Sequence, residues 1–201
     1  MEKQEDNIKD KNLFIYPNDW KEFMKSISKR NNKFLYEFQF QTGARFDEAL
    51  HIRPMDFDWE RNNVRLWKTK TKAKKGETHG SPRTISLSSD FSKRMKKFCE
   101  GKKNDEYLFK ISQAGYNQLL KRKLGDLLVL NAEQFSSHNI RKTHGMYLKA
   151  LGIDIAEICT RLGHDYNTYI KHYGSADVFS EKDMRGIREL LGDLYFRQRR
   201  Y

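Results

Sequence analysis

The sequence predicts a mainly α-helical fold with a small antiparallel β-sheet, an α+β class. Apolar residues recur at helical spacing along most of the 201-residue chain, whereas two short segments alternate apolar and polar residues as strands do. No internal repeat and no interdomain hinge interrupts these patterns. Residues 13–201 are therefore predicted to form a single domain, and the charged residues 1–12 a disordered tail.

Three helices are predicted ahead of the first strand. The first carries apolar residues at helical spacing over residues 17–27, and the second covers residues 34–40. The third is short, covers residues 48–52, and is expected to end before Pro54 because the residue preceding a proline avoids the helical conformation.

Two strands joined by a long connection follow. Val64 and Leu66 alternate with polar partners, and residues 83–87 alternate in the same way. A turn is predicted at residues 58–63. The stretch between the strands, residues 70–82, is rich in lysine, glycine and serine, which is typical of a flexible hairpin connection.

From Ser89 onward the pattern is helical. Three apolar stripes are followed by two helices whose ends can be recognised. Asp154 and Ser180 are positioned as the N-caps of these helices. Gly163 can end the helix that begins after Asp154, in the left-handed conformation. The three stripes comprise Met95, Phe98 and Cys99; Tyr116, Leu119, Leu120 and Leu124; and Ile140, His144, Tyr147 and Leu148.

The charge balance indicates a polyanionic partner. The chain has 39 Lys and Arg residues against 27 Asp and Glu residues, a formal net charge of +12. Such an excess attracts nucleic acid and speeds encounter with it. An anionic membrane is the weaker alternative, because no apolar run approaches the roughly 20 residues of a spanning helix. We therefore expect nucleic acid and no membrane.

Other kinds of site fit the sequence poorly. Cys99 and Cys159 are isolated, so neither a disulfide framework nor a zinc site is predicted, and free thiols suit a reducing, cytoplasmic compartment. The N-terminus lacks the apolar segment of a signal peptide. No Gly-x-x-x-x-Gly-Lys loop is present for a nucleotide. We expect no metal and no cofactor.

Two arginines are candidates for binding a phosphate, because a guanidinium group matches paired anionic oxygens. Arg45 follows a Thr-Gly turn, and Glu48 would share its helical face and hold it in place. Taken alone, this pair is equally compatible with a surface salt bridge. Arg141 lies three residues after His138, so one helix places both on one face, near an N-terminus whose free amides favour an anion.

A histidine and a tyrosine extend the pattern. His164 directly follows Gly163 and can project into a cleft, although a lone histidine is more often structural. Tyr166, Tyr169 and Tyr173 have the spacing of a buried helical stripe. This spacing alone does not choose between Tyr169 and Tyr173 as a nucleophile.

Together these residues resemble the catalytic domain of the tyrosine recombinases, the phage integrase family. The resemblance covers about residues 13–174 and is specific in order and spacing. It implies a site-specific recombinase or integrase that breaks and rejoins double-stranded DNA through a covalent 3′-phosphotyrosine intermediate. The strings that carry it are Thr42-Gly43-Ala44-Arg45, His138-Asn139-Ile140-Arg141, Leu162-Gly163-His164, and Tyr173 nine positions later.

The resemblance assigns the remaining roles. Tyr173 would be the nucleophile, while the two arginines and two histidines would stabilise the phosphate and accept a proton. A lysine on the hairpin, Lys70, would protonate the leaving 5′ oxygen. Lys68 and Lys72 lie on the same stretch, so the identity of the acid stays open. The predicted DNA contacts are Lys68, Lys72, Lys74, Lys75 and Arg83.

A phenol is a poor nucleophile at neutral pH. With an ordinary pKa of about 10, roughly one tyrosine in a thousand is ionised at pH 7. Neighbouring cations are therefore expected to lower the pKa of Tyr173, and a histidine to accept its proton.

One feature differs from most relatives, which have an additional N-terminal helical domain that closes around DNA. The 41 residues before Thr42 are too few for such a domain. We expect either a catalytic fragment or a compact recombinase, assembling with copies of itself on DNA. The last helix is expected on its own domain or on a neighbouring subunit. Two alternatives stay open: a DNA-relaxing enzyme like a type IB topoisomerase, and a DNA-binding remnant without cleavage.

Overall fold

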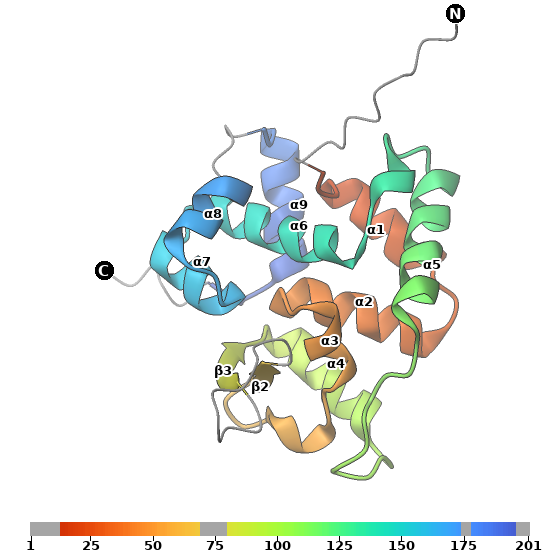
Figure 1. Cartoon of the computed structure of the whole chain (residues 1–201), viewed down its shortest axis with the longest axis vertical. Helices are drawn as coiled ribbons and strands as arrows, with labels where there is room; N and C mark the ends of the chain where they lie inside the picture. The colour runs from red at the N-terminus through yellow and green to blue at the C-terminus, as the bar shows by residue number, and fades with distance from the viewer. Residues whose placement is uncertain (1–12, 69–79, 174–177, 196–201) are drawn as a thin grey trace, which may run out of the picture.

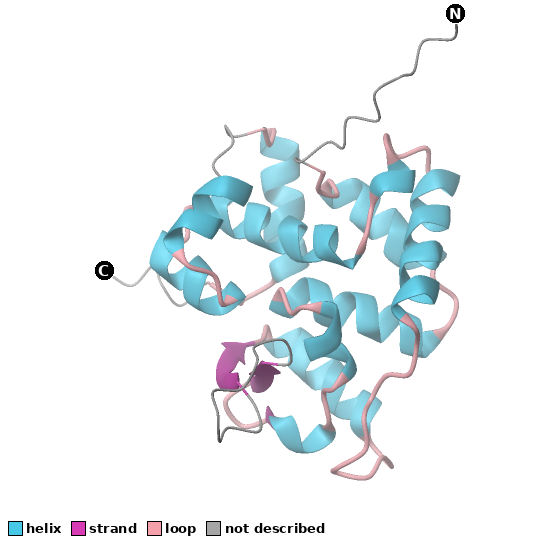
Figure 2. Cartoon of the chain, viewed as in Figure 1, coloured by secondary structure: helices cyan, strands magenta, loops and turns pink. Residues whose placement is uncertain are grey.

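Helices form most of the fold, and one small sheet lies at one end of it, as the two kinds of sequence pattern predicted (Figure 1 and Figure 2). The computed structural model describes residues 13–68, 80–173 and 178–195. The predicted disordered tail lies outside the described residues, and so do the predicted general acid, Lys70, and three predicted DNA-contacting lysines, Lys72, Lys74 and Lys75.

The elements follow the predicted order. In the first half they are α1 (Pro17–Ser26), α2 (Arg30–Thr42), α3 (Phe46–Leu50), the 3-10 turn η1 (Pro54–Asp56), β1 (Phe57–Asp58), β2 (Asn63–Lys68) and β3 (Gly80–Ser86). In the second half they are α4 (Ser89–Cys99), α5 (Gln113–Asp126), the 3-10 turn η2 (Ala132–Gln134), α6 (Ser137–Ala150), α7 (Ile155–Leu162), α8 (Tyr166–Tyr173) and α9 (Glu181–Leu191).

Polar caps define the helix ends where the sequence predicted them. The Asp154 side chain accepts a hydrogen bond from the N–H of Ala156 at 2.8 Å. The Ser180 hydroxyl accepts one from the N–H of Asp183 at 3.2 Å. Gly163 ends α7 with a φ of 61°, the left-handed conformation that glycine adopts without strain.

The sheet is antiparallel with strand order β1-β2-β3. Val64 pairs with Ile85, and Leu66 pairs with Arg83. Because alternate residues of a strand share a face, Arg83 projects to the same side as Ile85. That side is the buried one, since Val64, Leu66 and Ile85 are at most 2% exposed.

Helix α6 runs through the centre of the molecule and carries several predicted site residues (Figure 1). Ile140, Tyr147 and Leu148 on this helix are fully buried, and so are the polar side chains of Thr143 and His144. Because so many side chains of α6 are buried, close packing against its neighbours fixes the position of this helix.

The last helix packs on its own chain. Helix α9 lies against α1, where Lys21 forms an ion pair with Glu189. Gln41 Nε2 also donates to the carbonyl of Leu190 at 2.7 Å. Of the two positions expected for this helix, the structure has the one on the same domain. No helix in the described part of the chain is long and apolar enough to cross a membrane.

Candidate active site

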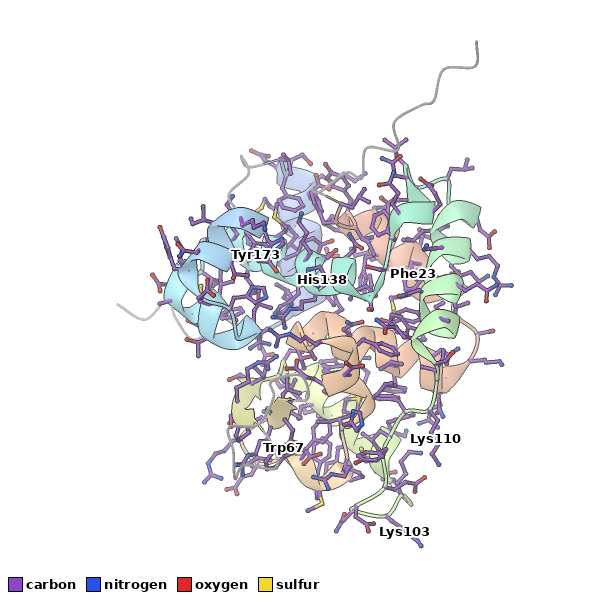
Figure 3. The ribbon with its side chains drawn as sticks, viewed as in Figure 1. Phe23, Trp67, Lys103, Lys110, His138 and Tyr173 are labelled. Atoms are coloured by element: carbon purple, nitrogen blue, oxygen red, sulfur yellow. The ribbon has the colours of Figure 1, made fainter. Side chains whose placement is uncertain are left out.

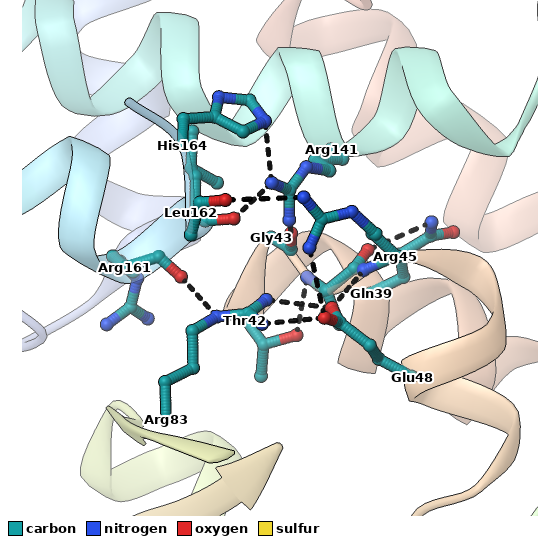
Figure 4. A network of polar contacts seen from close by, with 12 residues as sticks. Gln39, Thr42, Gly43, Arg45, Glu48, Arg83, Arg141, Arg161, Leu162 and His164 are labelled. Atoms are coloured by element: carbon teal, nitrogen blue, oxygen red, sulfur yellow. Dashed lines mark hydrogen bonds and ion pairs between the residues drawn. The ribbon is translucent and has the colours of Figure 1, made fainter. Parts of the chain in front are cut away.

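Four segments that are distant in sequence meet at one place in the fold. They are the turn after α2, the N-terminal half of α6 itself, the loop after α7, and the end of α8. Figure 3 shows His138 and Tyr173 in this region, and Figure 4 shows the polar network formed by the other side chains.

The turn that carries Arg45 depends on a glycine. Gly43 caps α2 with a φ of 63°, and its N–H donates to Gln39 O at 2.9 Å. A Cβ at this position would lie 2.5 Å from Leu162 Cδ2 and 2.8 Å from His144 Cδ2. Glycine is therefore required both for the backbone conformation and for close packing under the turn.

Glu48 lies at the centre of the network, with a side chain that is 0% exposed. Its carboxylate accepts from the backbone N–H of Arg45 at 2.7 Å and from Arg45 Nη1 at 3.2 Å. It also accepts two bonds from Arg83, at 2.6 and 2.7 Å. Glu48 therefore holds the chain at Arg45 and one strand of the sheet at the same time.

Arg83 makes internal contacts in the folded chain. The sequence predicted a DNA contact, but both terminal nitrogens of Arg83 are bonded to Glu48, and Nε donates to Arg161 O at 2.9 Å. The side chain is 14% exposed. The strand register turns it inward, so a phosphate contact would have to compete with a bidentate carboxylate.

Neutralising Glu48 is expected to destabilise the fold. Burial alone would raise the pKa of Glu48, but the hydrogen bonds and charge of Arg83, with smaller contributions from Arg45 and Arg141, lower it, so the carboxylate is charged at neutral pH. Glu48→Gln leaves Arg83 buried without a counter-charge, which costs about 3 kcal/mol. Urea unfolding measures this loss.

Glu37→Gln provides the matched control. Glu37 makes a similar bidentate pair with Arg94, but Arg94 is 41% exposed. An exposed pair contributes about 1 kcal/mol or less. Equal losses in the two variants would contradict a central role for Glu48.

Arg141 is almost completely buried, at 1% exposure. Nη1 donates to Gly43 O at 2.6 Å, and Nη2 donates to Leu162 O and, at 2.7 Å, to His164 Nε2. Burial, followed by the charge of Arg45, lowers the pKa of Arg141 to about 9, so it still carries its charge at neutral pH. Its guanidinium therefore joins the turn, the helix and the loop.

Two buried donors in this network have no partner among the described residues: Arg141 Nε and His164 Nδ1. Because His164 Nε2 accepts from Arg141, the proton of the neutral ring lies on Nδ1. An unsatisfied buried donor costs about 1–3 kcal/mol. An anion entering the site would offer acceptors to this group of positive and N–H-bearing side chains.

The histidines of the site are neutral in the free protein. Desolvation, then Arg141 and Arg45, lower the pKa of His164 to about 3. Desolvation and then Arg141 lower that of His138 to about 4, although His138 is a partly solvent-exposed residue. His172, which sequence reasoning missed, has its ring 6.0 Å from His138 and 6.5 Å from His164. Its position beside Tyr173 in the sequence was the available signal.

Tyr173 is brought to the site but its ring is buried, at 1% exposure. It stacks on Tyr169 at 5.4 Å and lies 6.1 Å from the His164 ring. It also packs directly on the backbone of α6, because a Cβ on Gly145 would lie 2.5 Å from Tyr173 Cε1. The helix and the tyrosine can approach this closely only with glycine at position 145.

The acidity expected of Tyr173 is wrong for the free protein. Burial raises its pKa to about 12, and the charges of Arg141 and Arg45 lower it only in part. The sequence-based expectation took account of the cations but not of desolvation. Here desolvation disfavours the phenolate more strongly than the cations stabilise it.

The predicted general acid and most predicted DNA-contacting lysines cannot be placed. Lys70, Lys72, Lys74 and Lys75 lie outside the described residues, and Lys68 ends β2 without a described side chain. The backbone of Lys68 pairs with Gly80 on β3, the strand that also carries Arg83.

Sequence reasoning also missed a buried cation, Arg161. Its Nε donates to His144 Nε2 at 2.9 Å, and Nη2 donates to Gln41 O and Ser86 O, both at 2.8 Å. It thereby ties α7 to α6, α2 and β3 behind the site. The signal was an arginine three residues after the core residue Ile158, on the same helical face.

Acid is expected to destabilise the fold through the buried histidines. The pKa of His144 lies well below its ordinary range because of burial and Arg161. The folded state then binds fewer protons than the unfolded state below pH 6.5, so the stabilisation is complete above that pH. The free energy of unfolding decreases as the pH falls from 6.5 toward the folded-state pKa values of the histidines. The decrease is about 1.4 kcal/mol per pH unit for each histidine.

Urea unfolding between pH 7 and 4.5 measures this slope. His164→Gln should make this slope shallower, because it removes a group whose pKa is lowered on folding. A slope unchanged by His164→Gln would show that this ring does not resist protonation.

Within the described residues, no group of three or more His, Cys, Asp or Glu side chains is arranged to hold a metal ion.

Known proteins that are similar in sequence to this chain include integrases and recombinases. A model of the phage integrase family matches residues 14–178. The chain is 25% identical over 181 residues to the probable integrase/recombinase YoeC of Bacillus subtilis (strain 168), covering 87% of this chain and 91% of YoeC. It is 24% identical over 141 residues to the tyrosine recombinase XerA of Saccharolobus solfataricus, covering 70% of this chain and 44% of XerA. The chain thus spans less than half of XerA.

Solved structures share the fold. The Tn1549 transposon integrase, in complex with transposon right-end DNA, has a TM-score of 0.65 at 17% identity, over 93% of this chain and 68% of that one. The catalytic domain of bacteriophage HP1 integrase has a TM-score of 0.60 at 18% identity, over 81% and 86%. These similarities confirm the predicted fold class.

Proposed function

The chain belongs to the phage integrase family, and from this premise we propose that it is a site-specific recombinase that cleaves and rejoins DNA through a 3′-phosphotyrosine intermediate. The observation that carries the proposal is the convergence of Arg45, Arg141 and His164 on one site beside the Tyr173 ring. The solved relative bound to transposon DNA supports DNA as the partner.

Arg45 and Arg141 bind the phosphate from two sides. The Arg45 side chain is 33% exposed, and the hydrogen bond from its Nη2 to Gly163 O is long, at 3.3 Å. Its guanidinium is therefore accessible to a phosphate at the mouth of the site. Arg141 lies deeper, and its Nε has no hydrogen-bond partner among the described residues. In the transition state negative charge grows on the equatorial oxygens, where fixed donors contribute most.

The chemistry is a transfer of the phosphoryl group to Tyr173. The phenolic oxygen attacks phosphorus, the P–O5′ bond breaks, and the 3′ phosphate is left esterified to the tyrosine. A neutral histidine accepts the phenolic proton, and Lys70 donates a proton to the leaving 5′ oxygen. Attack by a 5′ hydroxyl on the ester reverses these steps, so rejoining requires no external energy source.

Tyr173 must leave its buried position for this attack. In the free protein packing covers the Tyr173 ring, and the pKa raised by this burial keeps the phenol protonated. A bound phosphodiester occupies the donors around it and draws the hydroxyl outward, so cleavage is coupled to DNA binding. The hairpin lysines contact the DNA backbone, and copies of the chain assemble on DNA for strand exchange.

A nicked duplex suicide substrate tests the proposal, because the short 5′ product diffuses away and traps the covalent complex. The expected result is a protein–DNA band that is stable in SDS. Salt-sensitive binding without such a band would leave only a DNA-binding protein. Relaxation of supercoiled plasmids without any defined site would favour the topoisomerase alternative.

A sulfur leaving group identifies the general acid. Lys70→Ala should slow cleavage about 10²-fold, within the usual range for a general acid. A substrate with sulfur in place of the bridging 5′ oxygen should restore the rate, because a thiolate leaves without a proton. Lys68→Ala and Lys72→Ala serve as controls, and rescue of either one alone would transfer the role to that lysine.

A further inference from the structure

A buried glutamine joins the two segments that carry the phosphate-binding arginines. Gln39 lies on α2 at 1% exposure. Its Nε2 donates to Ala44 O at 3.2 Å and to Ser137 O at 2.9 Å. Ala44 immediately precedes Arg45, and Ser137 opens the helix that bears His138 and Arg141. Figure 4 shows Gln39 beside Arg45.

A tyrosine fixes the orientation of this glutamine. The Tyr116 hydroxyl donates to Gln39 Oε1, so the amide nitrogen must face the two carbonyls. The reversed amide would place its oxygen against both carbonyl oxygens. Tyr116 lies on α5, and its carbonyl accepts a hydrogen bond from the Tyr36 hydroxyl of α2 at 2.7 Å. Every hydrogen-bonding group of the Gln39 carboxamide is therefore used.

The contact between Arg141 and Gly43 O is a second link between the same two segments. Arg141, however, is also one of the two residues proposed to bind the phosphate. When its N–H groups bind phosphate oxygens, this link is weakened. Gln39 takes no part in the chemistry, so its two bonds persist while substrate is bound.

We propose that Gln39 is a positioning residue, which sets the separation of the Arg45 turn from the first turn of α6 and so the spacing of the two guanidinium groups around the phosphate. This inference rests on the proposed function. A misplacement of catalytic groups by about 1 Å can slow a reaction about 10²-fold without loss of binding.

Gln39→Leu removes the three hydrogen bonds while nearly keeping the side-chain volume. We expect the single-turnover cleavage rate on the suicide substrate to fall about tenfold to a hundredfold. The apparent DNA affinity should stay within about threefold, because affinity for DNA comes mainly from many backbone contacts. Gln39→Glu should be at least as slow, since a carboxylate cannot donate to the two carbonyls.

Gln41→Leu is the matched control. Gln41 is a buried glutamine on the same helix, but its Nε2 donates to Leu190 O on α9, away from the site. Thermal unfolding of both variants measures their losses of stability. If Gln39→Leu cleaves as fast as Gln41→Leu, the positioning role is wrong.

A double-mutant cycle separates positioning from general destabilisation. In an Arg45→Lys background the guanidinium that Gln39 positions is already absent. The additional effect of Gln39→Leu on the cleavage rate should then shrink to about threefold or less. An undiminished effect would overturn the inference. Absence of a covalent band with the wild-type protein would instead reject the proposed function, so the two failures are distinguishable.

Discussion

Tyr173→Phe is expected to abolish the SDS-stable protein–DNA band while leaving salt-sensitive DNA binding unchanged. The substitution removes only the oxygen that would form the bond to phosphorus. Losing a nucleophile of this kind lowers the rate by about 10⁴-fold or more. The ring stack on Tyr169 and the contact with Gly145 are retained, so the fold should be kept. Gel analysis of the suicide substrate and a DNA-binding titration give the two measurements.

Tyr169→Phe is the control for this change. Tyr169 is also buried, at 4% exposure, and stacks on Tyr173 from the same helix, so it tests whether loss of any hydroxyl there stops the reaction. It should cleave at a near-normal rate. The opposite outcome, with activity retained in Tyr173→Phe and lost in Tyr169→Phe, would reassign the nucleophile.

Removing either phosphate-binding arginine should have the next largest effect. Arg45→Ala and Arg141→Ala are each expected to slow cleavage about 10²–10³-fold, or about 2.7–4 kcal/mol of transition-state stabilisation. The variants should differ in stability. Arg141 holds Gly43 O, Leu162 O and His164 in the buried centre, whereas Arg45 lies partly at the surface. Single-turnover cleavage and urea unfolding, measured together, separate the two effects.

Arg94→Ala is the control for the arginine variants. It also breaks an arginine–carboxylate pair, with Glu37, but at a partly exposed position outside the site. Its cleavage rate should be near normal. A near-normal rate in Arg45→Ala or Arg141→Ala would remove that residue from the active site.

Much of the fold could be predicted because its signals are local. The change from helical spacing to alternation at Val64 and Leu66 predicted the sheet, and the caps at Asp154 and Ser180 predicted the starts of two helices. The family was predictable as well, because the order and spacing of a few short strings specify it.

The parts of the site that could not be predicted depend on contacts distant in sequence. The pKa of Tyr173 is raised because α6 and α8 close over its ring, which no count of nearby cations reveals. The pairing of Arg83 with Glu48 requires the strand register. Gln39 looks like an ordinary polar residue in α2 until Ala44 and Ser137 are brought to it by the fold.

Mapping the DNA-linked peptide tests the central claim most directly, because trypsin separates the candidate tyrosines. Cleavage after Arg161, Lys171 and Lys182 places Tyr166 and Tyr169 in the peptide 162–171 and Tyr173 in the peptide 172–182. After nuclease trimming of the covalent complex, mass spectrometry should find the residual nucleotide on peptide 172–182. A nucleotide on peptide 162–171, or on neither peptide, would contradict the assignment of Tyr173 as the residue that joins the protein to DNA.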